Sequence, residues 1–315
     1  MDAAFLDTGT LATSVDVLKE LPLNWSFYKE TKPDQTAQRI ANATIVVSNK
    51  VLLTREILQN SPHLKLICVA ATGYNNVDVV AAKSRGIKVC NIPNYSTPSV
   101  VQLTLTFILA LATNIIPYVE ATRAGRWQKS SLFCLLDSPI IELQGKKLGI
   151  IGYGNLGKQI ATLARAFGME ILIAQHSSKK AAVAGALPLE EVLKQSDFIT
   201  IHTPLTPETQ NLIQKKELAL MKPSAFLINT ARGGIVNEKD LAEALKNQRI
   251  AGAGVDVLTI EPPGKDNPLV QQDVPNLLLT PHVGWASLES RTRLLAILKD
   301  NIHSFLEGTP KNLIG

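Results

Sequence analysis

The chain has little cysteine, and the little it has is scattered. Its three cysteines, Cys68, Cys90 and Cys134, lie far apart and form no C-x-x-C motif. This pattern argues against a disulfide framework and against a cysteine-based metal site. We expect three reduced thiols, no bound metal and a cytoplasmic location.

A large net charge of either sign is also missing. The formal net charge is only +5, and there is no block of like charge and no basic stripe with interleaved aromatic residues. Nucleic acid is therefore not an expected partner. Asp2 and Asp7 stand where a secretory signal would need basic residues, so we expect no such signal.

No apolar run is long enough for an ordinary membrane span. The most apolar stretch, Val100–Ile116, is a little short for that role. We expect a helix that ends near Pro117, lies buried between domains or subunits, and needs no membrane. The polar residues that interrupt the stretch are Gln102, Thr104, Thr106, Thr113 and Asn114.

The chain does have enough residues and apolar content for two domains. It has 315 residues, of which 45% are hydrophobic and 19% charged. Short apolar runs alternate with helical patterns over residues 1–97, and the alternation restarts over residues 146–285. This pattern predicts an α/β fold with two doubly wound parallel sheets. The expected strands are Ala4–Leu6, Trp25–Tyr28, Ile45–Ser48, Lys65–Ala70, Lys88–Asn91, Lys147–Ile151, Glu170–Ala174, Phe198–His202, Ala225–Thr230, Ala253–Val257 and Leu277–Thr280. The expected helices, besides the apolar one, are Thr10–Glu20, Thr36–Ala41, Thr54–Gln59, Val77–Arg85, Asn155–Phe167, Leu189–Gln195, Lys215–Met221, Glu238–Asn247 and Leu288–Leu306.

One stretch, Lys146–Gly168, has the pattern of a dinucleotide-binding turn. An apolar strand leads into Gly152, Gly154 and Gly157, and an amphipathic helix follows. The first glycine allows a tight turn, the second lets the backbone approach a pyrophosphate, and the third lets helix and strand pack closely. Because the motif lies between a strand and a helix, we favour a cofactor site over a glycine-rich turn without a ligand.

Three polar residues follow predicted strands of the second half. They are Arg232, Glu261 and His282. The carboxyl ends of parallel strands line the ligand crevice of a doubly wound sheet, so we expect these side chains to converge. Arg offers a planar fork of donors for a carboxylate, His exchanges a proton near neutral pH, and a carboxylate beside His favours the imidazolium. Together they suit the reduction of a 2-oxo acid.

Other histidines lack this setting. His202 also ends a strand, but no acid follows it in register, so we favour a structural or secondary role. His63, His176 and His303 have no comparable loop context for proton transfer.

Several stretches match the pattern of one enzyme family. They are Ala71–Asp78, Leu148–Gly157, His202–Thr209, Asn229–Gly234, Gly254–Val257, Glu261–Pro262 and Thr280–Gly284. Through them the chain resembles the D-isomer-specific 2-hydroxyacid dehydrogenases over essentially its whole length. The segments Leu132–Cys134 and Asp137–Leu143 look most like the glycerate dehydrogenase (hydroxypyruvate reductase) branch.

The resemblance implies a role for each matching residue. Arg232 would hold the substrate carboxylate and help polarise its carbonyl. His282 would be the acid–base, paired with Glu261. Backbone groups of Thr72 and Gly73 would also bind the carboxylate. Contacts to the nicotinamide half of the cofactor would come from Thr203, Thr230 and Asp256. Further implied cofactor contacts are Asn155, Leu156, Pro204, Ala231, His282 and Gly284.

The resemblance also implies a domain division and a partner. Residues 1–98 with 288–315 would form a flavodoxin-like substrate domain, and residues 99–287 a Rossmann NAD(P)-binding domain. The family is usually dimeric, with the long helix near residue 105 in the interface, so a homodimer is expected. Gln102 stands where many members have an acid.

The expected cofactor is NADP or NAD. Gln175 stands where NAD-dependent members carry Asp or Glu, at the end of the second strand of the dinucleotide fold. Gln175 does not repel a 2′-phosphate, and His176 and Ser177, followed by two lysines, offer donors and positive charge for it. Alternatively, Gln175 binds both ribose hydroxyls of NAD and the lysines are solvated.

We therefore expect an NAD(P)-dependent reductase of hydroxypyruvate or glyoxylate, yielding D-glycerate or glycolate. One alternative is a D-lactate-type or broad 2-oxo acid reductase. Another is a dinucleotide-sensing binding protein, since corepressors that resemble these enzymes share the fold. Formate dehydrogenases of related fold are disfavoured, because they use Gln where this chain has Glu261.

Overall fold

The computed structural model describes residues 1–175 and 183–314 and divides the chain into two compact units. The first unit comprises Met1–Ser96 and the chain from Trp285 onward, and the second comprises Thr97–Gly284. The limits predicted from sequence, at residues 98 and 287, lie slightly further along the chain. Each unit holds one parallel sheet, so the predicted α/β class with two doubly wound sheets is confirmed.

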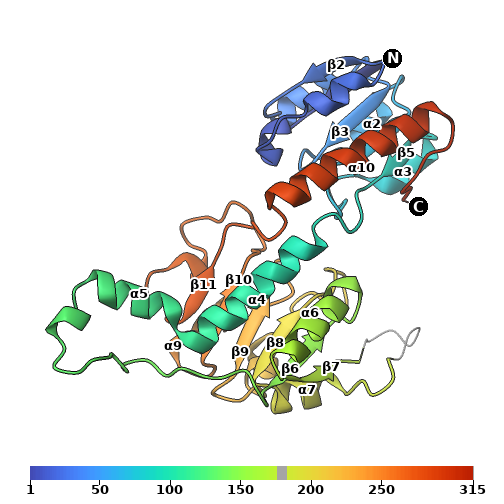
Figure 1. Ribbon diagram of the computed structural model, residues 1–315. Helices are drawn as coiled ribbons and strands as arrows, with labels where there is room; N and C mark the ends of the chain where they lie inside the picture. The colour runs from blue at the N-terminus through green and yellow to red at the C-terminus, as the bar shows by residue number, and fades with distance from the viewer. Residues whose placement is uncertain (176–182, 315) are drawn as a thin grey trace. The chain divides into compact units, whose positions relative to one another are not determined.

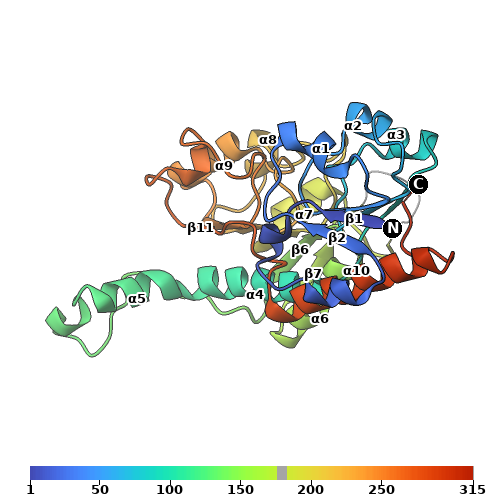
Figure 2. The same ribbon diagram turned by 90° about the horizontal axis from the view of Figure 1, so that it is seen from above.

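The first unit is built on a five-stranded sheet with the order β2-β1-β3-β4-β5. Buried apolar side chains cover both faces, with α10 on one face and α1, α2 and α3 on the other (Figures 1 and 2). The final helix thus returns to the first unit, as predicted. The strands are β1 (Asp2–Phe5), β2 (Asn24–Phe27), β3 (Ile45–Ser48), β4 (Leu66–Val69) and β5 (Lys88–Cys90), and the helices are α1 (Thr36–Ile40), α2 (Arg55–Gln59), α3 (Val79–Ser84) and α10 (Leu288–Leu306).

The helix predicted over Thr10–Glu20 is wrong. The chain instead forms two 3₁₀ helices, Thr8–Leu11 and Asp16–Glu20. Ala12 between them has φ 48°, a left-handed conformation that ends the first one. The spacing of the apolar residues predicts an α-helix here because a 3₁₀ turn also places residues three apart on one side. Leu11 and Leu18 are buried, as they would be in an α-helix.

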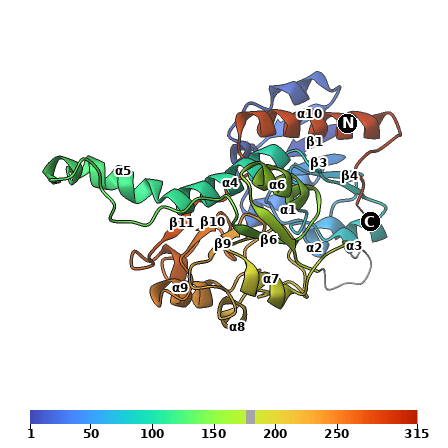
Figure 3. The same cartoon turned by 60° about the horizontal axis from the view of Figure 1, so that its bottom comes forward.

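The second unit is built on a six-stranded sheet with the order β11-β10-β9-β8-β6-β7. Leu187 adds an isolated parallel bridge to Ala174, beyond the end of β7. Helices α4 and α6 cover one face, and α7, α8 and α9 cover the other (Figure 3). The strands are β6 (Lys147–Ile151), β7 (Glu170–Ile173), β8 (Phe198–Ile201), β9 (Phe226–Asn229), β10 (Gly252–Val255) and β11 (Leu277–Leu279), and the covering helices are α4 (Thr97–Thr113), α6 (Asn155–Ala166), α7 (Leu189–Gln195), α8 (Lys215–Leu218) and α9 (Glu238–Lys246).

The apolar helix ends earlier than predicted. Asn114, with φ 49°, separates α4 from α5 (Ile115–Arg123), and the two helices are bent by 63°. Pro117 does not stop a helix but lies in the first turn of α5, where its missing N–H would have no intrahelical partner.

In the described part of the chain, no single helix is long and apolar enough to cross a membrane. The bent pair of α4 and α5 passes such a test by length and composition only. The buried side chains of α4 pack in its own unit, against α6 and the strands β9 and β10. A core helix of this kind passes the same test, so the pair is weak support for a membrane span.

Large apolar side chains are exposed along α5 and the chain that follows it, a segment (residues 115–140) that we call the apolar arm. In all three views α5 projects away from the sheet of its unit (Figures 1–3). Phe133 is 90% exposed. The other exposed apolar residues of the arm are Ile115, Ile116, Val119, Trp127, Leu132, Leu136 and Ile140.

All three cysteines are free thiols. Cys68 and Cys90 are buried on the neighbouring strands β4 and β5, with their sulfur atoms 3.2 Å apart. Burial raises the pKa of the Cys68 thiol. Cys134, in the apolar arm, is half-buried.

Candidate active site

The glycine turn connects β6 to α6, and each glycine meets a different constraint. Gly152 has φ +97°, and a Cβ there would lie 2.6 Å from the backbone of His202. A Cβ on Gly157 would collide with the carbonyl oxygen of Gly152, so α6 packs directly on the turn. A Cβ on Gly154 would meet nothing within 4 Å, so open space lies beside its backbone.

The start of α6 fits an anionic group. Its first turn carries no acidic side chain, and no side chain caps it at Gly154. Asn155 and Leu156, both predicted to contact the cofactor, are its first two residues. Because the first N–H groups of a helix attract phosphate, the open space at Gly154 suits the pyrophosphate of a dinucleotide.

The strand β7 leads to Gln175, whose backbone N–H donates to the carbonyl of Leu187 at 2.7 Å. The side chain of Gln175 is exposed. His176 and Ser177, together with the two lysines that follow, lie outside the described residues. Their contacts to a cofactor phosphate remain predictions.

The strand β8 ends at a histidine held in the sheet. His202 has Nε2 2.7 Å from the hydroxyl of Thr200, while Nδ1 is buried and has no hydrogen-bond partner in the described residues. Burial lowers the pKa of His202 to about 3, so its ring is neutral at pH 7. Thr203 is buried beside it, and the carbonyl of Pro204 accepts from Thr209 at 2.7 Å.

The loop after β9 carries Arg232 and is shaped by a residue that sequence reasoning treated only as part of a motif. The Asn229 side chain accepts from the N–H of Ala231 at 3.1 Å and donates to the carbonyl of Arg232 at 2.9 Å. Thr230 is buried, with its hydroxyl 2.8 Å from that of Thr104 on α4. The guanidinium of Arg232 is half-buried and donates to the carbonyl of Ala231 at 2.7 Å.

The structure brings His282 and Glu261 together. Nδ1 of His282 lies 2.6 Å from Oε2 of Glu261, and Oε1 of Glu261 accepts from the N–H of Leu258 at 2.8 Å. The side chains are 26% and 34% exposed, so both are accessible to solvent. Because Nδ1 faces the carboxylate, Nε2 is the nitrogen left for proton exchange.

A buried carboxylate shapes the loop on which His282 stands. Oδ1 of Asp256 accepts from the hydroxyl of Thr280 at 2.6 Å and the N–H of Val283 at 2.9 Å, and Oδ2 accepts from the N–H of Gly284 at 2.8 Å. The backbone carbonyl of Asp256 accepts from the N–H of His282 at 2.8 Å. Asp256 thus holds the turn in which His282 adopts φ 52°. Its implied contact to nicotinamide remains a prediction.

Thr72 and Gly73 belong to the first unit, just beyond the end of β4. The Thr72 hydroxyl donates to the carbonyl of Ile92 at 2.8 Å, and the Thr72 carbonyl accepts from Asn91 at 2.7 Å. The loop is therefore pinned at Thr72. Its predicted contact with a substrate carboxylate remains a prediction.

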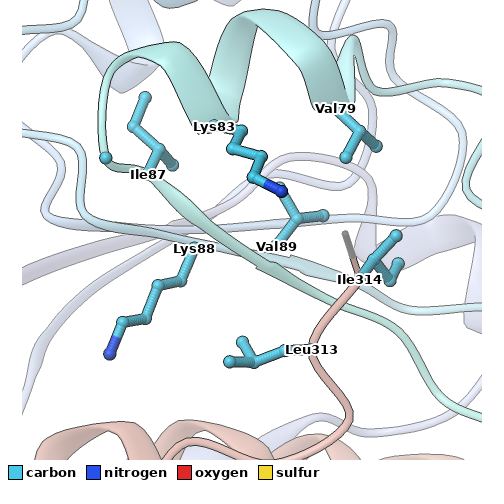
Figure 4. Close-up of a pocket in the computed structure, with 8 residues that line it drawn as sticks. Val79, Lys83, Ile87, Lys88, Val89, Leu313 and Ile314 are labelled. Carbon is cyan, nitrogen blue, oxygen red and sulfur yellow. The ribbon is translucent and has the colours of Figure 1, made fainter.

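Cavities of about 180 and 420 Å³ lie among described residues of the first unit. The smaller is lined by aliphatic side chains with Lys83 and Lys88 beside them (Figure 4). The larger includes Asp7 and Lys50, which follow β1 and β3. None of the predicted site residues lines either cavity. No group of three or more His, Cys, Asp or Glu that could hold a metal occurs in residues 1–175 and 183–314.

The contacts of Glu238 were not predicted from the sequence. Its carboxylate accepts hydrogen bonds from Thr259 and Asn267, in the segment that carries Glu261. The sequence shows only an acid at a helix start, which the helix dipole explains without reference to a site.

Comparison with known proteins assigns the chain to a family. The family model described as "D-isomer specific 2-hydroxyacid dehydrogenase, NAD binding domain" matches residues 105–284, all within the second unit. A glycerate dehydrogenase from Methylorubrum extorquens is 45% identical over 311 residues, covering 98% of each chain. A hydroxypyruvate reductase from Blautia hydrogenotrophica is 39% identical, covering 90% of this chain and 88% of its own. The structure of an acyclic imino acid reductase with NADPH and D-Arg superposes with a TM-score of 0.88 at 30% identity, covering both chains fully.

Proposed function

Because the chain belongs to the D-isomer-specific 2-hydroxyacid dehydrogenase family, it is an NAD(P)-dependent oxidoreductase of 2-hydroxy acids, and we propose that it reduces hydroxypyruvate or glyoxylate. The products would be D-glycerate and glycolate. The names of the relatives at 45% and 39% identity support this substrate class. The observation that carries the proposal is the contact of 2.6 Å between His282 and Glu261, since it gives the chain a proton donor.

In the proposed reaction the side chains bind the substrate and move one proton. The guanidinium of Arg232 pairs with the substrate carboxylate through two parallel N–H donors. Protonated His282 gives the proton on Nε2 to the carbonyl oxygen, while Glu261 fixes Nδ1 and stabilises the imidazolium. NADH or NADPH, when bound, supplies the hydride. In the oxidative direction neutral His282 takes the hydroxyl proton at Nε2.

The second unit would hold the cofactor and the first unit would contribute to substrate binding. The open space at Gly154 and the uncapped start of α6 support a dinucleotide at this turn. Thr72 and Gly73, in the first unit, are proposed to offer backbone groups to the carboxylate.

A steady-state screen tests the proposal. NADH and NADPH are each assayed with hydroxypyruvate, glyoxylate, pyruvate and phenylpyruvate. We expect the highest kcat/KM with hydroxypyruvate or glyoxylate. Highest efficiency with pyruvate or phenylpyruvate would favour a D-lactate-type or broad reductase. Binding of the dinucleotide without turnover of any acid would favour a sensing protein.

We also propose a cytoplasmic homodimer that uses the apolar arm. Phe133 is 90% exposed and is one of eight large exposed apolar side chains between residues 115 and 140. Many exposed apolar side chains on one projecting element are typical of an interface. Sedimentation of the wild type and of Phe133→Asp tests this. We expect a dimer that weakens in the variant, and a wild-type monomer would contradict the proposal. Cell fractionation checks the location.

A further inference from the structure

Glu238, the first residue of α9, directs its carboxylate away from its own helix. Oε1 accepts from both the backbone N–H and the hydroxyl of Thr259, each at 2.6 Å, and Oε2 accepts from the side-chain amide of Asn267 at 2.6 Å. Thr259 and Asn267 lie in the segment between β10 and β11, which also carries Glu261. One carboxylate thus ties two points of this segment to the start of α9.

These contacts are not those of a helix cap. Asn237 already caps α9, because its side chain accepts from the N–H of Asp240 at 3.1 Å. An acid in the first turn gains from the helix dipole wherever its oxygens point. The dipole does not explain why both oxygens of Glu238 bind groups outside the helix.

The backbone that Glu238 holds also supports the partner of the histidine. Next to Thr259, the N–H of Leu258 donates to Oε1 of Glu261 at 2.8 Å. The other oxygen of Glu261 meets Nδ1 of His282 at 2.6 Å. A hydrogen-bonded path therefore runs from Glu238 through the Leu258–Thr259 backbone to the imidazole.

The same backbone touches the loop that carries Arg232. A Cβ on Gly233 would collide with the carbonyl of Leu258 and the N–H of Thr259, so the two loops are in direct backbone contact. Any shift of Thr259 would press on Gly233 as well as on Glu261. Two loops of the proposed site thus depend on one anchored stretch.

We propose that Glu238 is a positioning residue, which holds Thr259 so that Glu261 stays in contact with His282. This inference rests on the proposed function, because it assigns Glu238 to the proton-donating side of that reaction. Glu238 acts through other residues and does not touch the substrate.

Glu238→Ala should lower kcat for reduction by up to about a hundredfold, since a small misplacement of reacting groups has effects of that size. The pH–rate profile should move in the direction produced by Glu261→Gln. Kd for NADH and NADPH, measured by fluorescence, should stay within about twofold of wild type, because the glycine turn is elsewhere. Thr259→Val replaces the hydroxyl with a methyl group and keeps the backbone N–H bond to Glu238, so it should give a smaller change in the same direction.

The matched control is Glu243→Ala, on the same helix. The side chain of Glu243 is exposed and makes no hydrogen bond or ion pair within the described part of the chain. We expect its kcat and pH profile to equal those of wild type. If Glu238→Ala fails to fold, Thr259→Val carries the same test.

A double-mutant cycle decides whether Glu238 acts through Glu261. In a Glu261→Gln background, Glu238→Ala should change kcat by less than about threefold, because the group it positions is already lost. Additive losses, or a Glu238→Ala enzyme with the kcat and pH profile of wild type, would overturn the inference while leaving the proposed function intact. Absence of turnover in the wild type itself would overturn both.

Discussion

Two histidines of the second unit stand at the carboxyl ends of parallel strands, and they have opposite surroundings. His202, after β8, has one ring nitrogen on Thr200 and the other buried without a partner in the described residues. His282, after β11, has Nδ1 on Glu261 and a side chain that is 26% exposed. A strand end is therefore not sufficient for proton chemistry. The ring also needs a carboxylate on one side and solvent on the other.

The backbone causes the difference. His202 directly follows the extended strand β8, so its side chain lies on the same face as Thr200, two residues earlier. His282 has φ 52°, and Asp256 holds its loop through three hydrogen bonds to the carboxylate. That turn takes the ring out of the sheet and toward Glu261.

The strongest test of the contrast removes each ring in turn. His282→Ala should lower kcat for reduction by roughly two to four orders of magnitude, the usual contribution of a general acid. His202→Ala should change kcat by less than about tenfold if the protein folds. Stopped-flow hydride transfer and Kd for the cofactor are measured for both. Equal losses in the two variants would mean that the strand ends do not differ in function.

Arg232→Lys extends the contrast to the end of β9. A lysine keeps the charge but loses the planar fork, at a cost of about 1.5–3 kcal/mol of charge-assisted hydrogen bonding in the transition state. We expect kcat/KM for the 2-oxo acid to fall roughly 10- to 150-fold. Wild-type efficiency in the variant would remove Arg232 from the substrate site.

Glu261→Gln makes the surroundings of His282 resemble those of His202, since neither ring would then face a carboxylate. The substitution removes the negative charge that faces Nδ1 and stabilises the imidazolium. We expect the pH–rate profile for reduction to move to lower pH. An unchanged profile would show that Glu261 is not the partner that matters.

His202 should affect the pH dependence of the free energy of unfolding rather than the reaction rate. Its folded pKa is about 3, against about 6.5 in the unfolded chain, so the unfolded state binds the proton first as pH falls. The free energy of unfolding should therefore decrease from about pH 6.5 toward pH 3, by at most about 1.4 kcal/mol per pH unit, with no effect above that window. Urea unfolding of His202→Gln should lack this component. His303→Gln, an exposed histidine of α10, is the control and should keep it.

The smallest expected effect concerns Gln175, after β7. An exposed Gln neither repels a 2′-phosphate nor pairs with it strongly, and exposed lysine contacts contribute at most about 1 kcal/mol. We expect NADPH and NADH to be used with kcat/KM values less than tenfold apart, with NADPH ahead. A preference for NADH of more than tenfold, about 1.4 kcal/mol, would show that Gln175 reads the ribose hydroxyls.

Periodicity and turn chemistry were sufficient to predict most of the fold. Ile45–Ser48, Leu189–Gln195 and Leu288–Leu306 were predicted with the bounds that the structure has. The predicted helices that were wrong fail where single residues have a left-handed backbone. The left-handed backbone of Ala12 interrupts the helix predicted over Thr10–Glu20. The left-handed backbone of Asn114 ends α4 before Pro117. Neither is visible in a pattern of apolar residues.

Candidate site residues can be proposed from the sequence where residue type alone implies chemistry, and less readily where contacts between distant residues decide their role. Arg232, Glu261 and His282 were singled out because they follow strands. Asp256 was expected at the cofactor, yet its carboxylate also shapes the His282 loop. Glu238 reads from sequence as an ordinary helix-start acid, since its partners lie more than twenty residues away in the chain.

The distribution of thiols gives this protein a single convenient handle for labelling. Cys68 and Cys90 are buried in the first sheet, whereas Cys134 is half-buried on the apolar arm, next to the fully projecting Phe133. A maleimide dye or spin label applied under native conditions should react at Cys134 alone, without any substitution of the chain. Energy transfer or dipolar coupling between two such labels would then report directly on whether the arms of two copies meet.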